Sequence, residues 1–127
     1  MSEEQEVRLI LSSNDPNRVY PALVLALGAT AMGAKVKVYC TMLGYDVIKK
    51  GGADKIQLPG FPPASKFMKD AMDAGVEFIA CAPSKEVLTQ MGITEETVEK
   101  GVKLEDVIPF LNEALPSVKK GGLVLFI

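Results

Sequence analysis

The chain has 127 residues, a formal net charge of −2, 48% hydrophobic residues and 6% aromatic residues. These values predict a single domain over residues 1–127 with one hydrophobic core. Acidic and basic residues are interspersed without a basic stripe, which argues against nucleic acid as a partner. Two cysteines and no histidine exclude a Cys-His or Ser-His-Asp device, and a Cys/His zinc site, within one chain.

The start of the chain, MSEEQEVR, is acidic and polar and therefore unlike a secretory signal peptide. The longest mostly apolar stretch, residues 20–32, is shorter than the ~20 residues that a membrane-spanning helix needs. We therefore expect a cytoplasmic protein without a membrane span.

An apolar run and a proline predict the first strand and the first helix. Residues 7–12 form a short apolar run that leads into polar residues, which indicates a buried strand and a turn. Pro16 favours the start of a helix, and residues 20–32 are apolar on nearly every face before Gly33. Pro21 should lie in the first turn or kink this helix. Because the sheet covers only one side of such a helix, we expect a second copy of the chain to cover the other.

The rest of the chain alternates between strands and helices. In chain order we expect a strand at residues 35–40, a loop at 41–44, a helical turn at 45–50, a loop at 57–63, a helix at 65–74, a strand at 76–81, a helix at 84–91, a short acidic helix at 94–101, a helix at 104–115 that contains Pro109, and a closing strand at 123–127. Apolar strands that alternate with helices indicate a parallel sheet covered on both faces.

Both cysteines end predicted strands, at the edge where open parallel sheets bind ligands. Cys81 ends the third strand and precedes a helix that begins near Pro83. The free amides and the positive dipole end of that helix should lower the pKa of the thiol, and Lys85 in its first turn should add to the effect. We therefore predict Cys81 as the catalytic residue.

Five further residues at this edge are candidates for substrate binding: Asn14, Cys40, Thr41, Ser84 and Lys85. Ser84 is equally expected to cap its helix, and Asn14 to be a turn residue. Cys40 fits a buried hydrophobe better, because no clear helix cap follows it. The methionines fit core packing, and GxGxxG and P-loop fingerprints are absent, so we expect neither a metal nor an organic cofactor.

A specific resemblance begins in residues 75–102, GVEFIACAPSKEVLTQMGITEETVEKGV. An apolar strand ends in Cys81, and Ser84 follows three residues later. Gly92-Ile93 closes the next helix, and Gly101-Val102 follows a short polar segment. With the strand and the Lys-Lys-Gly-Gly run of residues 38–52, this segment resembles the DsrE/DsrF-like family of sulfur-relay proteins, which includes the TusD sulfurtransferase subunits.

The resemblance implies a three-layer α/β/α sandwich with a mainly parallel sheet of about five strands and a trimeric or hexameric assembly. It also implies a cysteine that holds sulfur as a persulfide or thiosulfonate, and Cys81 matches that position. Cys40 matches no family residue. Some relatives carry a second cysteine shortly after the first, whereas residues 82–91 contain none.

The leading hypothesis is therefore a sulfur carrier of the sulfurtransferase type. The Cys81 thiolate would take sulfane sulfur from a donor persulfide or thiosulfate and pass it to the thiol of a partner protein or small molecule. A first alternative is a non-catalytic scaffold or binding subunit of a sulfur-relay oligomer, in which Cys81 is only a packing residue. A second alternative is a redox-active thiol, in which Cys40 resolves an oxidised Cys81.

Overall fold

The computed structural model describes residues 5–127, so the first four residues of the acidic start, on which the expectation of no signal peptide rested, lie outside it. The strands are β1 (Glu6–Leu11), β2 (Lys35–Cys40), β3 (Glu77–Ala82), β4 (Lys103–Asp106) and β5 (Leu123–Phe126). The helices are α1 (Pro16–Ala31), α2 (Tyr45–Ile48), α3 (Ala64–Asp73), α4 (Lys85–Gln90) and α5 (Val107–Lys119), with 3-10 turns η1 (Met42–Gly44) and η2 (Ala53–Lys55).

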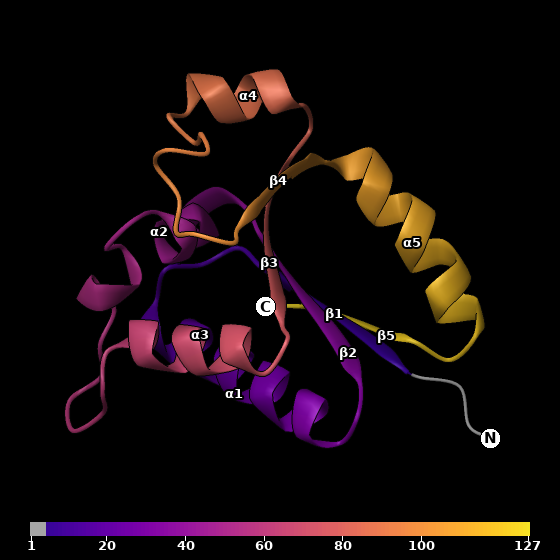
Figure 1. Cartoon of the computed structure of the whole chain (residues 1–127), viewed down its shortest axis with the longest axis horizontal. Helices are drawn as coiled ribbons and strands as arrows, with labels where there is room; N and C mark the ends of the chain where they lie inside the picture. Colours follow the sequence, from indigo (N-terminus) through magenta and orange to yellow (C-terminus); the bar gives the residue numbers. More distant parts are fainter. Residues whose placement is uncertain (1–4) are drawn as a thin grey trace.

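The strands form one sheet in the order β4-β3-β2-β1-β5, and every neighbouring pair is parallel. The chain steps in one direction from β1 to β4 and then returns across the sheet to β5. Because crossovers between parallel strands are right-handed, this reversal places the last helix on the opposite face. Accordingly, α1 and α3 cover one face of the sheet and α5 covers the other (Figure 1). This arrangement confirms the predicted three-layer α/β/α sandwich.

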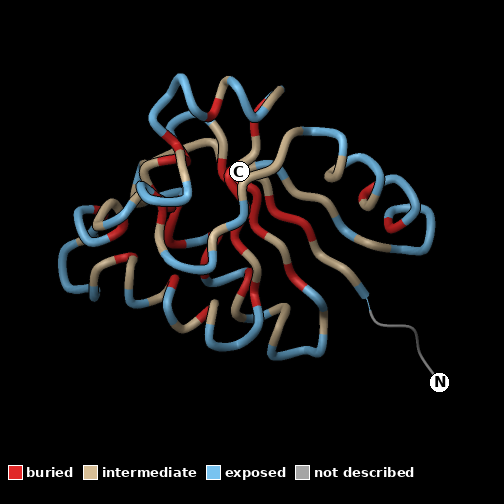
Figure 2. Tube along the Cα trace, turned by 45° about the horizontal axis from the view of Figure 1, so that its top comes forward, coloured by how far each residue is buried: buried red, intermediate tan, exposed pale blue. Residues whose placement is uncertain are grey.

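The face of the sheet under α1 and α3 carries the hydrophobic core. Alternate strand residues such as Leu9, Val38 and Phe78 are fully buried there. Figure 2 shows how the buried positions follow the strands through the centre of the molecule. From α1, Leu23 packs into this core, whereas Leu25 on the outer side is exposed. The sheet and α3 thus cover one side of α1, as expected, and its outer side keeps an apolar surface.

The opposite face of the sheet is charged at the amino ends of the strands. The Arg8 side chain is only 4% exposed and donates to Glu6 at 2.7 Å and to Glu113 of α5 at 3.1 Å. Lys37 on the neighbouring strand donates to Glu113 at 2.5 Å and lies 3.5 Å from Glu77. A buried guanidinium requires such partners, so these contacts fix the middle of α5 against the sheet.

The expectation for residues 94–106 was wrong in two respects. Residues 94–101 form turns and an isolated β-bridge to Lys49 and not a short helix, because the Glu99 amide donates to the Ile48 carbonyl at 2.8 Å and not to a carbonyl within the segment. The expected helix at 104–115 also starts later, since its first residues belong to β4. This strand is short and charged, as edge strands often are, and only its pairing with β3 reveals it.

The helix α5 confirms the predicted helix over residues 107–115. The apolar residues that marked this helix do not pack against the sheet, as such residues usually do, and most of them face away from it. Its apolar outer positions are exposed: Ile108, Leu111, Leu115 and Val118. The inner side instead presents Phe110, Glu113 and Ala114 to the sheet. Pro109 lies in the first turn, where a missing amide donor has no cost. By contrast, Pro21 lies inside α1, beyond its first turn.

Within residues 5–127, none of the helices combines the length and the apolar character needed to cross a membrane.

Candidate functional site

The carboxyl ends of the central strands bring Cys81 next to an aromatic side chain of α5. Ile10 is in register with Tyr39, and Tyr39 with Ile79, so these residues share the face covered by α5. Cys81 lies two residues beyond Ile79 on β3 and therefore points to the same face. Phe110 of α5 packs against Tyr39 edge to face, with ring centroids 4.7 Å apart.

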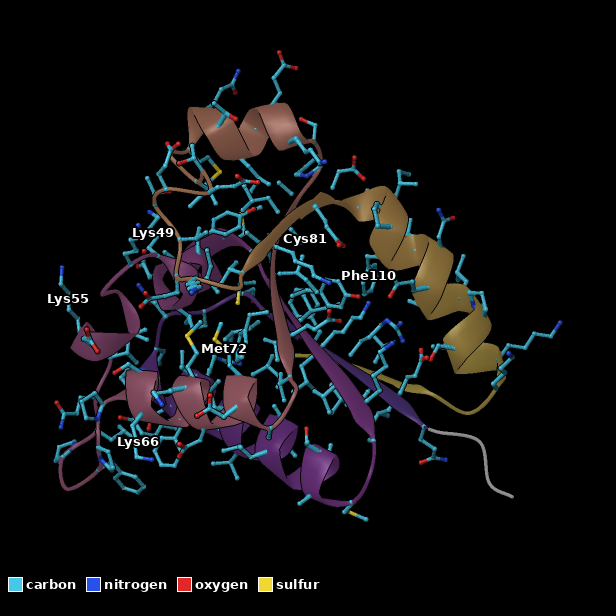
Figure 3. All side chains as sticks on the ribbon, in the orientation of Figure 1. Lys49, Lys55, Lys66, Met72, Cys81 and Phe110 are labelled. Atoms are coloured by element: carbon cyan, nitrogen blue, oxygen red, sulfur yellow. The ribbon has the colours of Figure 1, made fainter. Side chains whose placement is uncertain are left out.

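These side chains surround a cavity of about 320 Å³ that we call the thiol pocket. Its lining residues are Ile10, Tyr39, Thr41, Met42, Cys81, Ala82, Pro83, Val107 and Phe110. Figure 3 shows Cys81 and Phe110 on the same side of the sheet, in the space between β3 and α5. Cys81 is partly exposed, so its sulfur is accessible at an apolar recess of the molecular surface.

The electrostatic environment of Cys81 is opposite to the predicted one. Burial raises the pKa of the Cys81 thiol, and the carboxylates of Glu105 and Asp106 on β4 raise it further. Glu105 is in register with Cys81 on the neighbouring strand. The expectation that a helix start and Lys85 lower this pKa was wrong, because burial of the thiol and the carboxylates of β4 both disfavour the thiolate. At neutral pH the sulfur is therefore mostly protonated.

The backbone at Cys81 is held by a neighbouring helix. The hydroxyl of Tyr45, at the start of α2, donates to the carbonyl oxygen of Cys81 at 2.6 Å. Tyr45 itself is almost fully buried, so this hydrogen bond ties the backbone of Cys81 to a packed side chain. It fixes the end of β3 and hence the position of the thiol.

Cys40 lies on the other face of the sheet. It is in register with Ala80, whose neighbour Cys81 points the opposite way. Cys40 is fully buried in the core under α1 and α3, and burial raises its thiol pKa to about 12. The sheet itself therefore separates the two sulfurs, which argues against Cys40 as a substrate contact or as a resolving thiol for Cys81.

The other predicted contacts are distributed over three places. Thr41 lines the thiol pocket with Cys81. The Ser84 hydroxyl accepts from the Val87 amide at 3.2 Å and caps α4, as expected. Lys85 is exposed at the start of this short helix. Asn14 donates to Asp46 at 2.9 Å and lines a separate cavity of about 530 Å³ between α1 and α2.

Sequence reasoning missed the residues that shape the thiol pocket. Tyr39 and Phe110 come from segments read as a strand and a helix, and only the crossing of α5 over the sheet brings them together. Met42 has a positive φ of 52°, a conformation that is rare for residues other than glycine. Two residues later, Gly44 has no room for a Cβ because the carbonyl oxygen of Leu11 lies against it. Met42 and Cys81 line the same pocket, and Gly44 was the available sequence signal for this tight loop.

The fold and this site define a parallel three-layer α/β/α protein with one accessible thiol at the carboxyl edge of its sheet. The DsrE/DsrF/DrsH-like family matches residues 3–66, about half of the chain. The chain belongs to this family, which confirms the predicted relationship. The matched part contains β1, α1 and β2 but ends before Cys81. It includes residues 38–52, which contributed to the resemblance, but not residues 75–102, which carried most of it.

A protein of Methanocaldococcus jannaschii named "Uncharacterized protein MJ0760" is 27% identical over 100 residues. The alignment covers 79% of this chain and 35% of that protein. The chain thus spans about a third of the relative's length.

Proposed function

We propose that the chain is a sulfur carrier of the sulfurtransferase type, in which Cys81 holds sulfane sulfur as a persulfide and passes it to a partner thiol. The observation that carries this proposal is the unequal placement of the two thiols: Cys81 lines an accessible pocket, whereas Cys40 is fully buried. Membership of the DsrE/DsrF/DrsH-like family supports a sulfur-relay role.

The transfer conserves electrons and atoms. The Cys81 sulfur attacks the outer sulfur of a persulfide RSSH and forms a new sulfur–sulfur bond, while the bond between the two donor sulfurs breaks. The electron pair leaves with the RS⁻ group, which takes the proton that Cys81 loses. The products are the Cys81 persulfide and RSH, and the reverse chemistry on a second thiol delivers the sulfur. No metal or organic cofactor takes part.

The experiment is mass spectrometry of the intact protein after incubation with an organic persulfide. The expected result is a mass gain of one sulfur atom in the wild-type chain and in Cys40→Ala. Cys81→Ser should show no such gain. A second thiol added afterwards should remove the extra sulfur. Equal labelling of Cys81→Ser and the wild type would contradict the proposal.

A second candidate is a scaffold or binding subunit of a sulfur-relay oligomer. It is favoured by the raised pKa of the Cys81 thiol and by the exposed apolar positions of α5. Titration with an alkylating reagent separates the two functions. A Cys81 that fails to react near pH 8 in the native protein supports the scaffold, whereas measurable reaction supports the carrier.

We also propose that the chain is cytoplasmic and assembles into a trimer or hexamer through the outer side of α1. Val24, Leu25 and Met32 are 54%, 47% and 90% exposed there, and such apolar side chains favour burial against another copy. Analytical ultracentrifugation tests this assembly. A monomer at micromolar concentration would exclude it.

A further inference from the structure

The thiol pocket is uniformly apolar. None of its nine described lining residues carries a charge, and the only hydroxyls come from Tyr39 and Thr41. Its volume of about 320 Å³ lies at the small end of the range for pockets that bind low-molecular-weight ligands. Its size and lining therefore match a small organic group better than a hydrated ion.

Two carboxylates on the neighbouring strand act on Cys81. Glu105 faces it from the neighbouring strand, and Asp106 follows at the start of α5. Both carboxylates act on the thiol in the same direction as burial, against a negative charge on sulfur. The same field repels an anionic donor that approaches along the pocket.

Two buried or half-buried cations on this face, Arg8 and Lys37, are paired near the other end of the strands. Lys37 contacts Glu113 and Glu77, and Arg8 contacts Glu6 and Glu113. Arg8 and Lys37 line a separate polar cavity with the C-terminal half of α5 and do not line the thiol pocket. An anion in the thiol pocket therefore has no positive side chain among the described lining residues to compensate its charge.

We propose that the sulfur donor of Cys81 is an apolar organic persulfide of low molecular weight that reacts in its neutral RSSH form, and that the pocket discriminates against inorganic sulfur oxyanions such as thiosulfate. This inference rests on the proposed function and specifies its substrate class. It names Val107 as a residue that determines specificity, since Val107 lines the pocket and is 37% exposed at its edge.

The leaving groups of the two donors also differ in charge. With an organic persulfide, the departing RS⁻ takes the Cys81 proton and leaves as a neutral thiol. With thiosulfate, the Cys81 sulfur attacks the outer sulfur, the sulfur–sulfur bond breaks, its electron pair leaves on sulfite, and the Cys81 proton moves to the outer sulfur of the new persulfide. Sulfite is an anion that leaves past Glu105 and Asp106. Electrostatic repulsion therefore opposes both the approach of thiosulfate and the presence of sulfite in the pocket.

The experiment compares benzyl hydropersulfide with thiosulfate as donors to the wild-type chain. The rate of sulfur gain on Cys81 is measured by mass spectrometry, and each rate is divided by that of N-acetylcysteine with the same donor. This normalisation removes the intrinsic reactivity of the two donors. The expected normalised rate for thiosulfate is about tenfold or more below that for benzyl hydropersulfide.

A charge introduced at the pocket edge sharpens the test. Val107→Lys should raise the normalised thiosulfate rate severalfold, because its ammonium offsets the two carboxylates. Ala74→Lys is the matched control, since Ala74 is exposed at the end of α3, on the face of the sheet opposite the pocket; it should leave both rates unchanged. Both substitutions are at exposed positions, and circular dichroism verifies that the variants fold.

Two results are distinguishable. Equal normalised rates for the two donors in the wild type would overturn the proposed substrate class and leave the carrier function intact. Failure of both donors to label Cys81, or equal labelling of Cys81→Ser, would overturn the proposed function together with this inference.

Discussion

The two faces of the five-stranded sheet differ in composition and in packing. Under α1 and α3, strand residues such as Leu11, Val36 and Phe78 form a continuous apolar core. Under α5, the amino ends of the strands carry paired charges, whereas the carboxyl ends surround the thiol pocket. The first face is built for stability, and the second leaves space at the end where its single accessible cysteine lies.

The position of each cysteine follows from this difference. Cys40 and Cys81 occupy similar places near the ends of adjacent strands, yet a shift of one residue in register puts them on opposite faces. One sulfur is therefore a core atom and the other a surface atom. A cysteine at a strand end has a chemical role only if it points to the face that remains open.

The largest expected difference between the faces concerns thiol labelling. In the native protein at pH 8, iodoacetamide should modify Cys81 about a hundredfold faster than Cys40 or more, because Cys40 reacts only after the core opens. Peptide mapping by mass spectrometry measures both rates. The Cys81 rate should still be rising above pH 9, since the pKa of its thiol is raised from the ordinary 9.0.

Glu105→Gln removes one of the two carboxylates that raise the pKa of Cys81. The labelling profile of Cys81 should then shift to lower pH, while Cys40 labelling stays unchanged. A profile that does not move would show that Glu105 does not act on the thiol.

The next largest effect concerns aromatic side chains on the two faces. Phe78→Ala should lower the free energy of unfolding by about 4 kcal/mol, because Phe78 is fully buried. Phe110→Ala should cost about 2 kcal/mol, since Phe110 is only half-buried beside Tyr39. Urea denaturation followed by circular dichroism measures both. Equal losses of unfolding free energy in the two variants would contradict the conclusion that the face under α1 and α3 is packed more tightly than the face under α5.

A smaller effect is expected from the charge cluster under α5. Glu113→Gln should lower the free energy of unfolding by about 1–2 kcal/mol, because buried Arg8 loses a partner while Glu113 itself is 41% exposed and screened by solvent. Glu95→Gln, at an exposed turn, is the matched control and should be neutral. Urea denaturation at neutral pH measures both variants.

The same cluster predicts a dependence of stability on pH. Contacts with Arg8, Lys103 and Lys37 hold the pKa values of Glu6, Glu77 and Glu113, respectively, below the ordinary 4.5.

Groups with a lowered pKa stabilise the fold above about pH 4.5, and that contribution is lost as the pH falls through the lowered values. Thermal denaturation between pH 6 and pH 3 should show this loss, and a smaller loss in Glu113→Gln. An identical slope in the variant would count against the contribution of Glu113.

The smallest effect on stability is expected on the two outer surfaces. Leu115→Ser on α5 and Leu25→Ser on α1 should each change the free energy of unfolding by less than about 0.5 kcal/mol, because both side chains are exposed. Their effect on sedimentation should differ. If the outer side of α1 forms the assembly, only Leu25→Ser yields smaller species; the reverse result would assign the interface to α5.

Much of the architecture could be predicted because it depends on local pattern. The alternation at residues 35–40 predicted β2 with its observed bounds, and Ser84 was correctly expected to cap α4. The strand β4 could not be predicted, because Lys103–Asp106 is charged and becomes a strand only by pairing with β3. The pattern at residues 104–115 likewise indicated a helix but not which side faces the sheet.

The position of the candidate site could be predicted from the sequence, but the charges and burial around its thiol could not. A strand that ends at Cys81 beside a helix start was sufficient to locate the thiol at the carboxyl edge. Its pKa depends on Glu105, which is distant in sequence and adjacent in the sheet. No local rule connects these two residues.

By itself, the sequence determined the α/β class, most elements and the family relationship, because hydrophobic periodicity and turn residues act over a few neighbours along the chain. Only the tertiary structure decided which face each cysteine occupies, which side chains line the thiol pocket and which charges lie beside Cys81. These properties depend on strand order and on the crossing of α5 over the sheet, and both are set by the packing of segments far apart in the chain.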